Sequence, residues 1–189
     1  VIGEAEPLLA SLIHALSDFA VTPRDALLLR IGATLPGCYA PAFYRFIYAD
    51  NGEVRGIAVP AELPPRIAKV IAPEMERAAH STLLSPEAEL GMYMVELGRG
   101  CSRGCRFCAA GFIYRPPRLW RTETILRGLE DRPERIDRIG LLGMEMASSE
   151  TVDAIAGYLR EHGCALSFSS LRADRISSQT LALLAASNL

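Results

Sequence analysis

Three cysteines, Cys101, Cys105 and Cys108, stand in a C-x-x-x-C-x-x-C arrangement within residues 98–108. Thiolates at this spacing can bind three of the irons of an iron–sulfur cubane. Each of the four irons takes one external ligand, so three cysteines leave one iron open for a substrate or cofactor. An electron-transfer site would normally close that position. The triplet therefore predicts a cluster that takes part in chemistry.

Two other interpretations of the triplet stay open. A zinc site needs four ligands, usually in two short pairs, and every histidine of the chain is distant in sequence, so zinc would need a remote fourth ligand. The cysteines could also lie on one buried helix face, as small hydrophobic residues. The glycines around them favour a loop instead, because each glycine costs helix stability. Cys38 and Cys164 are isolated, and we interpret both as packing residues.

Composition restricts the class of protein. The chain has 189 residues, half of them hydrophobic, which suffices for one good core or for one domain with parts of others. Its formal net charge of −2 gives no global attraction to nucleic acid or to a membrane surface. No apolar run is long enough to span a bilayer, and no leader segment is recognisable. Unpaired cysteines beside a thiolate cluster predict a reducing, cytoplasmic location.

Local charge is less even, because six arginines and no acidic residue fall between Gly98 and Thr122. These arginines could form a basic rim beside an anionic cluster, or a surface for an anionic substrate. They could equally be solvated and paired with Glu96, Glu123 and Glu130. Nucleic acid is the lesser expectation for this stretch, and no membrane partner is expected.

The elements that position the cysteines alternate between strand and helix from residue 92 onward. Apolar patterning predicts strands at 92–97, 138–142 and 165–168, and helices at 123–131, 149–162 and 178–186. We expect Ser148 or Ser149 to cap the second of these helices and Gly163 to end it. Alternation with short loops predicts parallel strands joined by right-handed crossovers, and thus an α/β fold. Three such units are too few to close a barrel, so we expect a fragment cut at both ends.

The first half of the chain has a different pattern. It predicts an amphipathic helix from Pro7 to about Phe19, and a second helix at 23–30 capped by Thr22. Asp50-Asn51-Gly52 between two β-prone runs, 43–48 and 54–59, predicts a hairpin. Residues 60–90 have the composition of a linker that contains a helix-prone segment at 66–79.

Residues 90–189 resemble the radical S-adenosylmethionine (SAM) superfamily. In that resemblance Cys101, Cys105 and Cys108 match the ligands of a [4Fe–4S] cluster, and Phe107 matches the aromatic residue beside the adenine of SAM. The superfamily has a Gly-Gly-Glu-like turn after the second strand that holds the amino group of SAM. Here it reads Gly143-Met144-Glu145, which makes Gly143 and Glu145 candidates for SAM binding.

Two further candidates follow the third strand, where residues 167–174 are similar to the same segment in part of the superfamily. Arg172 would bind the SAM carboxylate through a two-pronged guanidinium contact, and Ser170 would reach the ribose or the carboxylate. In the alternative interpretation, Glu145 is a solvated loop residue, the serines cap the next helix, and Arg172 pairs with Asp174.

Residues 110–118 and the opening Gly3-Glu4-Ala5-Glu6 look like the subgroup with a cobalamin-binding domain before the barrel. The D-x-H-x-x-G pattern that supplies a cobalt ligand in many such domains is absent here, so cobalamin is implied only for a longer parent chain. The resemblance implies a helical tail of that domain at 1–36, a hairpin and linker at 37–89, and the N-terminal half of a partial TIM barrel at 90–189.

The resemblance implies an enzyme that takes one electron from a flavodoxin or ferredoxin type of donor and cleaves SAM to a 5′-deoxyadenosyl radical. Its substrate is not specified by these residues. Two functions of other classes remain as alternatives: a non-catalytic iron–sulfur carrier, and a zinc-bearing module that binds nucleic acid. The carrier fits less well because the fourth iron would be open.

Overall fold

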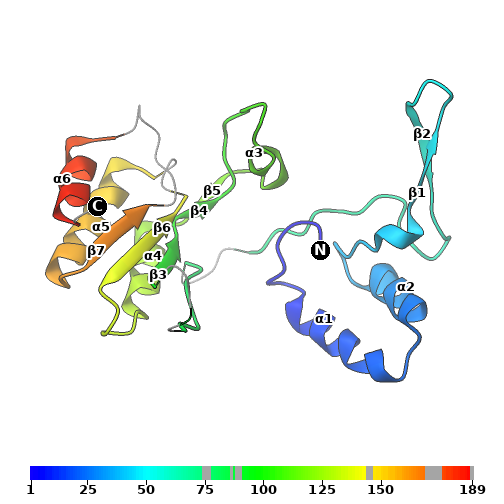
Figure 1. The fold of residues 1–189 in the computed structure, drawn as a ribbon, viewed down its shortest axis with the longest axis horizontal. Helices are drawn as coiled ribbons and strands as arrows, with labels where there is room; N and C mark the ends of the chain where they lie inside the picture. Colours follow the sequence, from blue (N-terminus) through cyan, green and yellow to red (C-terminus); the bar gives the residue numbers. More distant parts are fainter. Residues whose placement is uncertain (74–77, 86, 88–90, 144–146, 169–175, 188–189) are drawn as a thin grey trace. The chain divides into compact units, whose positions relative to one another are not determined.

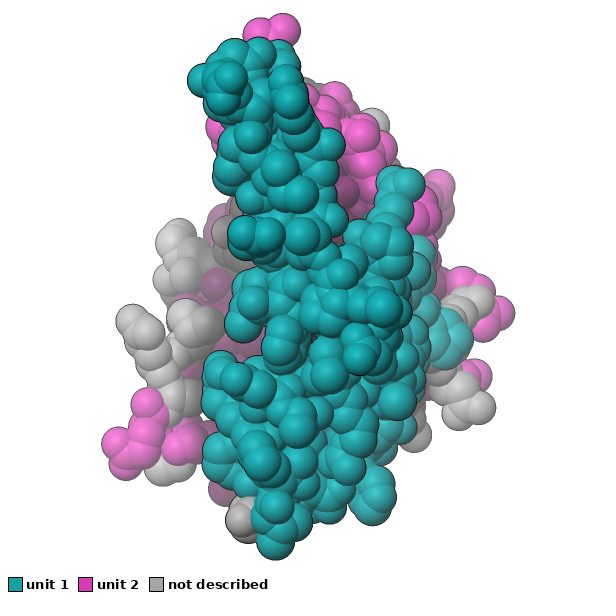
Figure 2. All heavy atoms as spheres, turned by 90° about the vertical axis from the view of Figure 1, so that its right-hand side faces the viewer, with its two compact units in different colours: residues 1–73 teal, residues 74–189 magenta. Residues whose placement is uncertain are grey.

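The computed structural model describes residues 1–73, 78–85, 87, 91–143, 147–168 and 176–187. The chain forms two compact units, residues 1–73 and 74–189, which Figure 2 shows in different colours. Both units contain helices and strands, so the predicted α/β class is confirmed at this level. Among the described helices, none is long and apolar enough to cross a bilayer.

The first unit begins with two helices, α1 (Leu9–Leu16) and α2 (Arg24–Thr34), joined through a 3₁₀ turn, η1 (Ser17–Ala20). Leu8, Leu27 and Ile31 form their shared core together with Cys38, which fits its interpretation as a packing residue. Both predicted helices are present, but α1 is shorter than predicted because a 3₁₀ turn replaces its last residues, and α2 extends four residues beyond the predicted end at residue 30. The predicted Thr22 cap is wrong, because Pro23 occupies the N-cap position and no side chain there accepts a hydrogen bond.

The predicted hairpin is present in the first unit, with antiparallel strands β1 (Arg45–Tyr48) and β2 (Val54–Ala58). Gly52 adopts a φ of +83°, and its backbone N–H donates to the carbonyl of Ala49 at 2.9 Å. Glycine adopts this left-handed backbone conformation without steric strain, which is why Asn-Gly favours tight turns. A short 3₁₀ turn, η2 (Pro41–Phe43), precedes β1, so the strand starts two residues later than predicted.

The helix-prone segment at 66–79 forms no helix in its described residues, 66–73 and 78–79, so this prediction is wrong. Tertiary hydrogen bonds hold the segment extended instead. Val70 forms a parallel bridge with Gly3, and the backbone N–H of Ala72 donates to the buried Glu4 carboxylate at 2.7 Å. Local helix propensity is a weak preference that such contacts override.

The second unit is built on one parallel sheet in the order β3–β6–β7, as Figure 1 shows. The strands are β3 (Tyr93–Glu96), β6 (Arg138–Leu142) and β7 (Ala165–Phe168), and the helices are α4 (Thr122–Glu130), α5 (Ser149–Glu161) and α6 (Ser178–Ala186). The predicted parallel pairing is confirmed. Ser148 caps α5 by accepting the N–H of Thr151 at 3.2 Å, and Gly163, at φ +61°, follows the end of that helix.

One face of this sheet is packed against the helices. The buried residues of β3 alternate along the chain, as a sheet with one covered face requires, and in β6 Gly140 is buried between Ile139 and Leu141. The large buried side chains of the strands all belong to the covered face. These are Tyr93, Val95, Ile139, Leu141 and Leu166, and they share one core with Ile125, Leu129, Ile155, Leu159 and Leu183 of the helices. Apart from Gly140, residues at the alternate positions, whose side chains belong to the opposite face of the sheet, are only half-buried; examples are Met94, Glu96 and Ser167.

The two edges of the sheet differ. Along β3, the Ala79 carbonyl accepts the N–H of Glu96 at 2.9 Å, and His80 forms an antiparallel bridge with Val95. The His80 ring also stacks on Tyr93 and lies 3.2 Å from a carboxylate oxygen of Asp131. In the part of the chain that the structure describes, β7 has a strand partner on one side only.

Candidate functional site

The cysteine loop leaves the carboxyl end of β3 through a short antiparallel ribbon. Its strands are β4 (Gly98–Arg99) and β5 (Arg118–Leu119), with Gly98 opposite Leu119 and Arg99 opposite Arg118. Figure 1 shows this ribbon leading from the sheet to the loop, which carries the short helix α3 (Ala110–Ile113). The ribbon therefore closes the loop at its base, and α4 follows directly after it.

Gly100 explains how the two limbs of the loop come close together. It has a φ of +80°, and a Cβ atom there would overlap the carbonyl oxygen of Tyr114. Only glycine combines this backbone conformation with such a close approach. The residue directly before Cys101 is thus fixed against the returning limb, which agrees with the predicted loop.

The three cysteines of the loop are free thiols. Cys105 is exposed, while Cys101 and Cys108 are half-buried. The backbone N–H of Arg103 donates to Sγ of Cys101 at 3.4 Å, and the N–H of Cys108 donates to the carbonyl of Cys105 at 3.0 Å. Within the described ranges, no three His, Cys, Asp or Glu side chains are already grouped to hold a metal ion.

The donor chemistry of the loop nevertheless fits a soft metal centre. Three unpaired thiols lie on one partly exposed loop without an acidic side chain, and thiolates are the usual ligands of iron–sulfur clusters. A cluster held by all three thiols would require their sulfur atoms to converge, on a loop whose base the ribbon closes.

A network of charged and aromatic side chains lies at the base of the loop. Oε2 of Glu96 accepts a hydrogen bond from Nε of Arg99 at 2.9 Å and one from Nε1 of Trp120 at 3.3 Å. The guanidinium carbon of Arg99 lies 5.8 Å from the centroid of the Trp120 ring. The side chains of Glu96 and Arg99 are only 20% and 11% exposed. Glu96 therefore contacts residues on both sides of the cysteines.

The predicted pairing of the loop arginines is found for Arg99 with Glu96. Arg115 donates to the carbonyl of Arg103 at 3.3 Å and lies 4.8 Å from the ring centroid of Phe112. Four arginines of the loop are exposed, alongside exposed apolar side chains such as Phe107 and Phe112. These exposed arginines are Arg103, Arg106, Arg115 and Arg121.

The structure describes two of the residues predicted to bind SAM. Phe107 is 92% exposed. Gly143 follows β6 with a φ of +83°. It lies against the backbone of Gly98, at the carboxyl ends of the strands, where the cysteine loop begins. Glu145, Ser170 and Arg172 lie outside the described residues.

Trp120 and Glu96 are the site residues for which sequence reasoning gave no specific role. Trp120 is the single tryptophan of the chain and follows the arginine-rich run directly, which was the available signal. The sequence predicts Glu96 only as a counter-ion for the arginines. Its contact with Trp120 spans 24 residues and depends on the ribbon.

The two cysteines outside the triplet have environments of another kind. Burial raises the pKa of the Cys38 thiol, and burial also raises the pKa of the Cys164 thiol. Cys164 packs at the margin of the core of the second unit. Both environments favour the neutral thiol, which is a poor nucleophile and a poor metal ligand.

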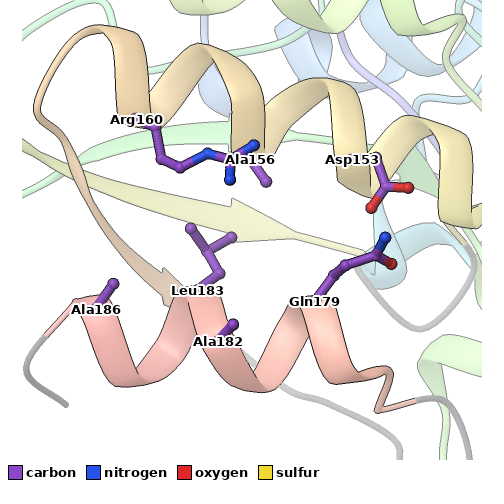
Figure 3. Close-up of a pocket in the computed structure, with 7 residues that line it drawn as sticks. All are labelled: Asp153, Ala156, Arg160, Gln179, Ala182, Leu183 and Ala186. Carbon is purple, nitrogen blue, oxygen red and sulfur yellow. The ribbon is translucent and has the colours of Figure 1, made fainter.

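A pocket lies between α5 and α6, as Figure 3 shows. Asp153, Ala156 and Arg160 line it from α5. Gln179, Ala182, Leu183 and Ala186 line it from α6. Neither of the described SAM-binding candidates, Phe107 and Gly143, lines it, and no cysteine of the triplet does. The candidate site therefore remains the cysteine loop and the carboxyl ends of the strands.

Comparison with known proteins gives one distant relative of undescribed function. The chain is 30% identical over 108 residues to an uncharacterized protein of Methanocaldococcus jannaschii, covering 54% of this chain and 24% of that protein. The chain thus spans about a quarter of the length of this relative. No model of a known protein family matches the chain. No solved structure matches it either.

Proposed function

We propose that the chain is the N-terminal half of a radical SAM partial TIM barrel, with Cys101, Cys105 and Cys108 as the ligands of a [4Fe–4S] cluster. One observation carries this proposal: the cysteine triplet occupies a loop at the carboxyl end of the first strand of a parallel sheet. Such a cluster, with SAM at its open iron, supplies one-electron cleavage of SAM to a 5′-deoxyadenosyl radical.

The geometry of the sheet supports the barrel. Barrel enzymes place their sites at the carboxyl ends of parallel strands. Here the cysteine loop follows the carboxyl end of β3, and Gly143 follows the carboxyl end of the neighbouring β6. The helices pack on one face of the sheet and leave the other face half-buried. All-parallel sheets are normally covered on both faces, and in a barrel the second face is filled by the remaining strands.

The residues of this chain have distinct roles in the proposed site. The three thiolates hold the cluster, and the N–H of Arg103 donates to Cys101 Sγ, a contact of the kind that adjusts the reduction potential of a cluster. The exposed ring of Phe107 offers a flat apolar face to the adenine of SAM. Glu145 and Arg172 would bind the amino and carboxylate groups of SAM, with Ser170 on the ribose or carboxylate.

The reaction belongs to a longer protein in this proposal, since the relative is about four times the aligned length. Residues 1–36 would then be the helical tail of a preceding domain, with cobalamin as its possible cofactor. A small electron carrier of the flavodoxin or ferredoxin type would reduce the cluster, in the cytoplasm.

The test is anaerobic purification, reconstitution with iron and sulfide, and low-temperature EPR of the reduced chain before and after adding SAM. We expect a reduced-cubane signal that changes with SAM, disappears in Cys105→Ala and persists in the control Cys164→Ala. A cluster signal that does not respond to SAM would instead indicate an electron carrier. Stoichiometric zinc without a cluster signal would contradict the proposal and favour a zinc-bearing binding module.

A further inference from the structure

We propose that Glu96 is a positioning residue of the cysteine loop, which binds both ends of the loop and offsets the charge of Arg99 beside the cluster. The second part of this inference, the effect on a cluster, rests on the proposed function. Its first part, the restraint of the loop, concerns the metal-free chain. The two parts can therefore be tested separately.

The restraint follows from where the two hydrogen-bond donors stand in the chain. Arg99 is two residues before Cys101, and Trp120 follows the returning strand β5. Both donate to the same carboxylate oxygen of Glu96. Hydrogen bonds to a charged acceptor are about twice as strong as neutral ones. The ribbon alone supplies only two residue pairs, so the Glu96 carboxylate adds substantially to the closure of the loop.

The charge of Glu96 is also needed within the ribbon. Arg99 stands directly opposite Arg118, and like charges in that position repel across an antiparallel pair. The Glu96 carboxylate, 2.9 Å from Nε of Arg99, lowers this repulsion. Because both side chains of the Glu96–Arg99 pair are mostly buried, solvent screens their interaction less than it screens a surface pair.

The same pair controls the charge near Cys101. The reduction potential of an iron–sulfur cluster depends on net charge and on hydrogen bonds around it. Replacing Glu96 by glutamine keeps an oxygen acceptor but adds one net positive charge beside the loop. Since the reduced cluster carries one more negative charge, this substitution raises the reduction potential. A residue that only stabilised the fold would change the amount of cluster and leave its potential unaltered.

The experiment compares the wild-type chain with Glu96→Gln, Trp120→Phe and a control, Glu161→Gln. Glu161 is an exposed carboxylate at the end of α5. Because α5 leads into β7, it ends at the amino ends of the strands, whereas the cysteine loop leaves from a carboxyl end. Trp120→Phe removes the Nε1 donor and keeps an aromatic ring. Limited trypsin digestion of the metal-free chain measures access to the exposed loop arginines, and an EPR-monitored redox titration measures the cluster potential.

We expect trypsin to cut the loop about five-fold faster in Trp120→Phe, as the loss of about one hydrogen bond predicts. We expect faster cutting in Glu96→Gln as well, because the retained oxygen still accepts both hydrogen bonds but without the strength that the carboxylate charge adds. We also expect a higher cluster potential in Glu96→Gln alone. Unchanged digestion in both variants would overturn the restraint. An unchanged potential in Glu96→Gln with a formed cluster would overturn the electrostatic role. A wild-type chain without any cluster would instead contradict the proposed function, and the digestion would still decide the restraint.

Discussion

Gly143, at the end of β6, packs directly against the backbone of Gly98 at the start of the cysteine loop. A Cβ atom at Gly143 would lie 3.1 Å from the carbonyl oxygen of Gly98. Gly98 in turn stands three residues before Cys101. The turn after the second strand of the sheet and the base of the cysteine loop are therefore in contact, and this contact fixes the loop relative to the sheet.

We predict that Gly143→Ala lowers the free energy of unfolding by about 1–3 kcal/mol, because alanine is strained at a φ of +83° and approaches Gly98 closely. Urea unfolding of the chain measures this. The matched control is Gly157→Ala in α5, where an added Cβ meets no atom within 4 Å. That change should stabilise the chain by about 0.5–1 kcal/mol. Equal effects at both glycines would contradict the strain argument.

The core of the second unit gives a second prediction. Leu129→Ala, at a fully buried position of α4, should lower the free energy of unfolding by about 2–5 kcal/mol. Leu181→Ala in α6 is the control, because more than half of that side chain is exposed. Its effect should stay within about 0.5 kcal/mol. Thermal or urea unfolding measures both, and comparable losses would show that Leu129 is not a core residue.

The five thiols should differ in reactivity. Burial raises the pKa of Cys38 and of Cys164, so a smaller fraction of each is thiolate at any pH below the raised pKa. Cys105 is exposed. We expect iodoacetamide to alkylate Cys105 of the metal-free chain before Cys38 and Cys164, as measured by peptide mass spectrometry over time. In concentrated urea the difference should disappear, and its persistence there would exclude the folded environment as its cause.

The N-terminus of α5 predicts a pH dependence. Backbone hydrogen bonding at the helix start, followed by the Ser148 hydroxyl, lowers the pKa of Glu150 from its usual range. A carboxyl whose pKa is lowered on folding adds stability that is present above its ordinary pKa and is lost as the pH falls through the lowered one. We therefore expect Glu150→Gln to have a lower melting temperature than the wild type at neutral pH, and the same one in strong acid. A difference that does not change with pH would contradict this account.

Much of the second unit could be predicted because its signals are local. The apolar runs at 138–142 and 165–168 and the helix at 178–186 have the predicted bounds in the structure. The Asn-Gly turn likewise predicted the hairpin of the first unit. These patterns report burial and turn geometry directly, and both are decided within a few residues.

The features that could not be predicted depend on residues far apart in the sequence. The segment near Val70 is extended because Gly3 and Glu4 bind its backbone across more than sixty residues. Glu96 and Trp120 meet only because the ribbon brings the two limbs of the loop together. The grouping of the three thiols remains a prediction.

The two edges of the sheet are unlike. The edge of β3 is occupied by the segment around His80. In the described residues the outer edge of β7 has no strand beside it. A further strand joining this sheet would therefore meet a β3 edge at which Val95 and Glu96 are already paired, whereas the described residues place no strand beside β7. The extended segment around His80 thus covers part of the β3 edge, which is one of the ways in which proteins protect sheet edges from pairing with other strands.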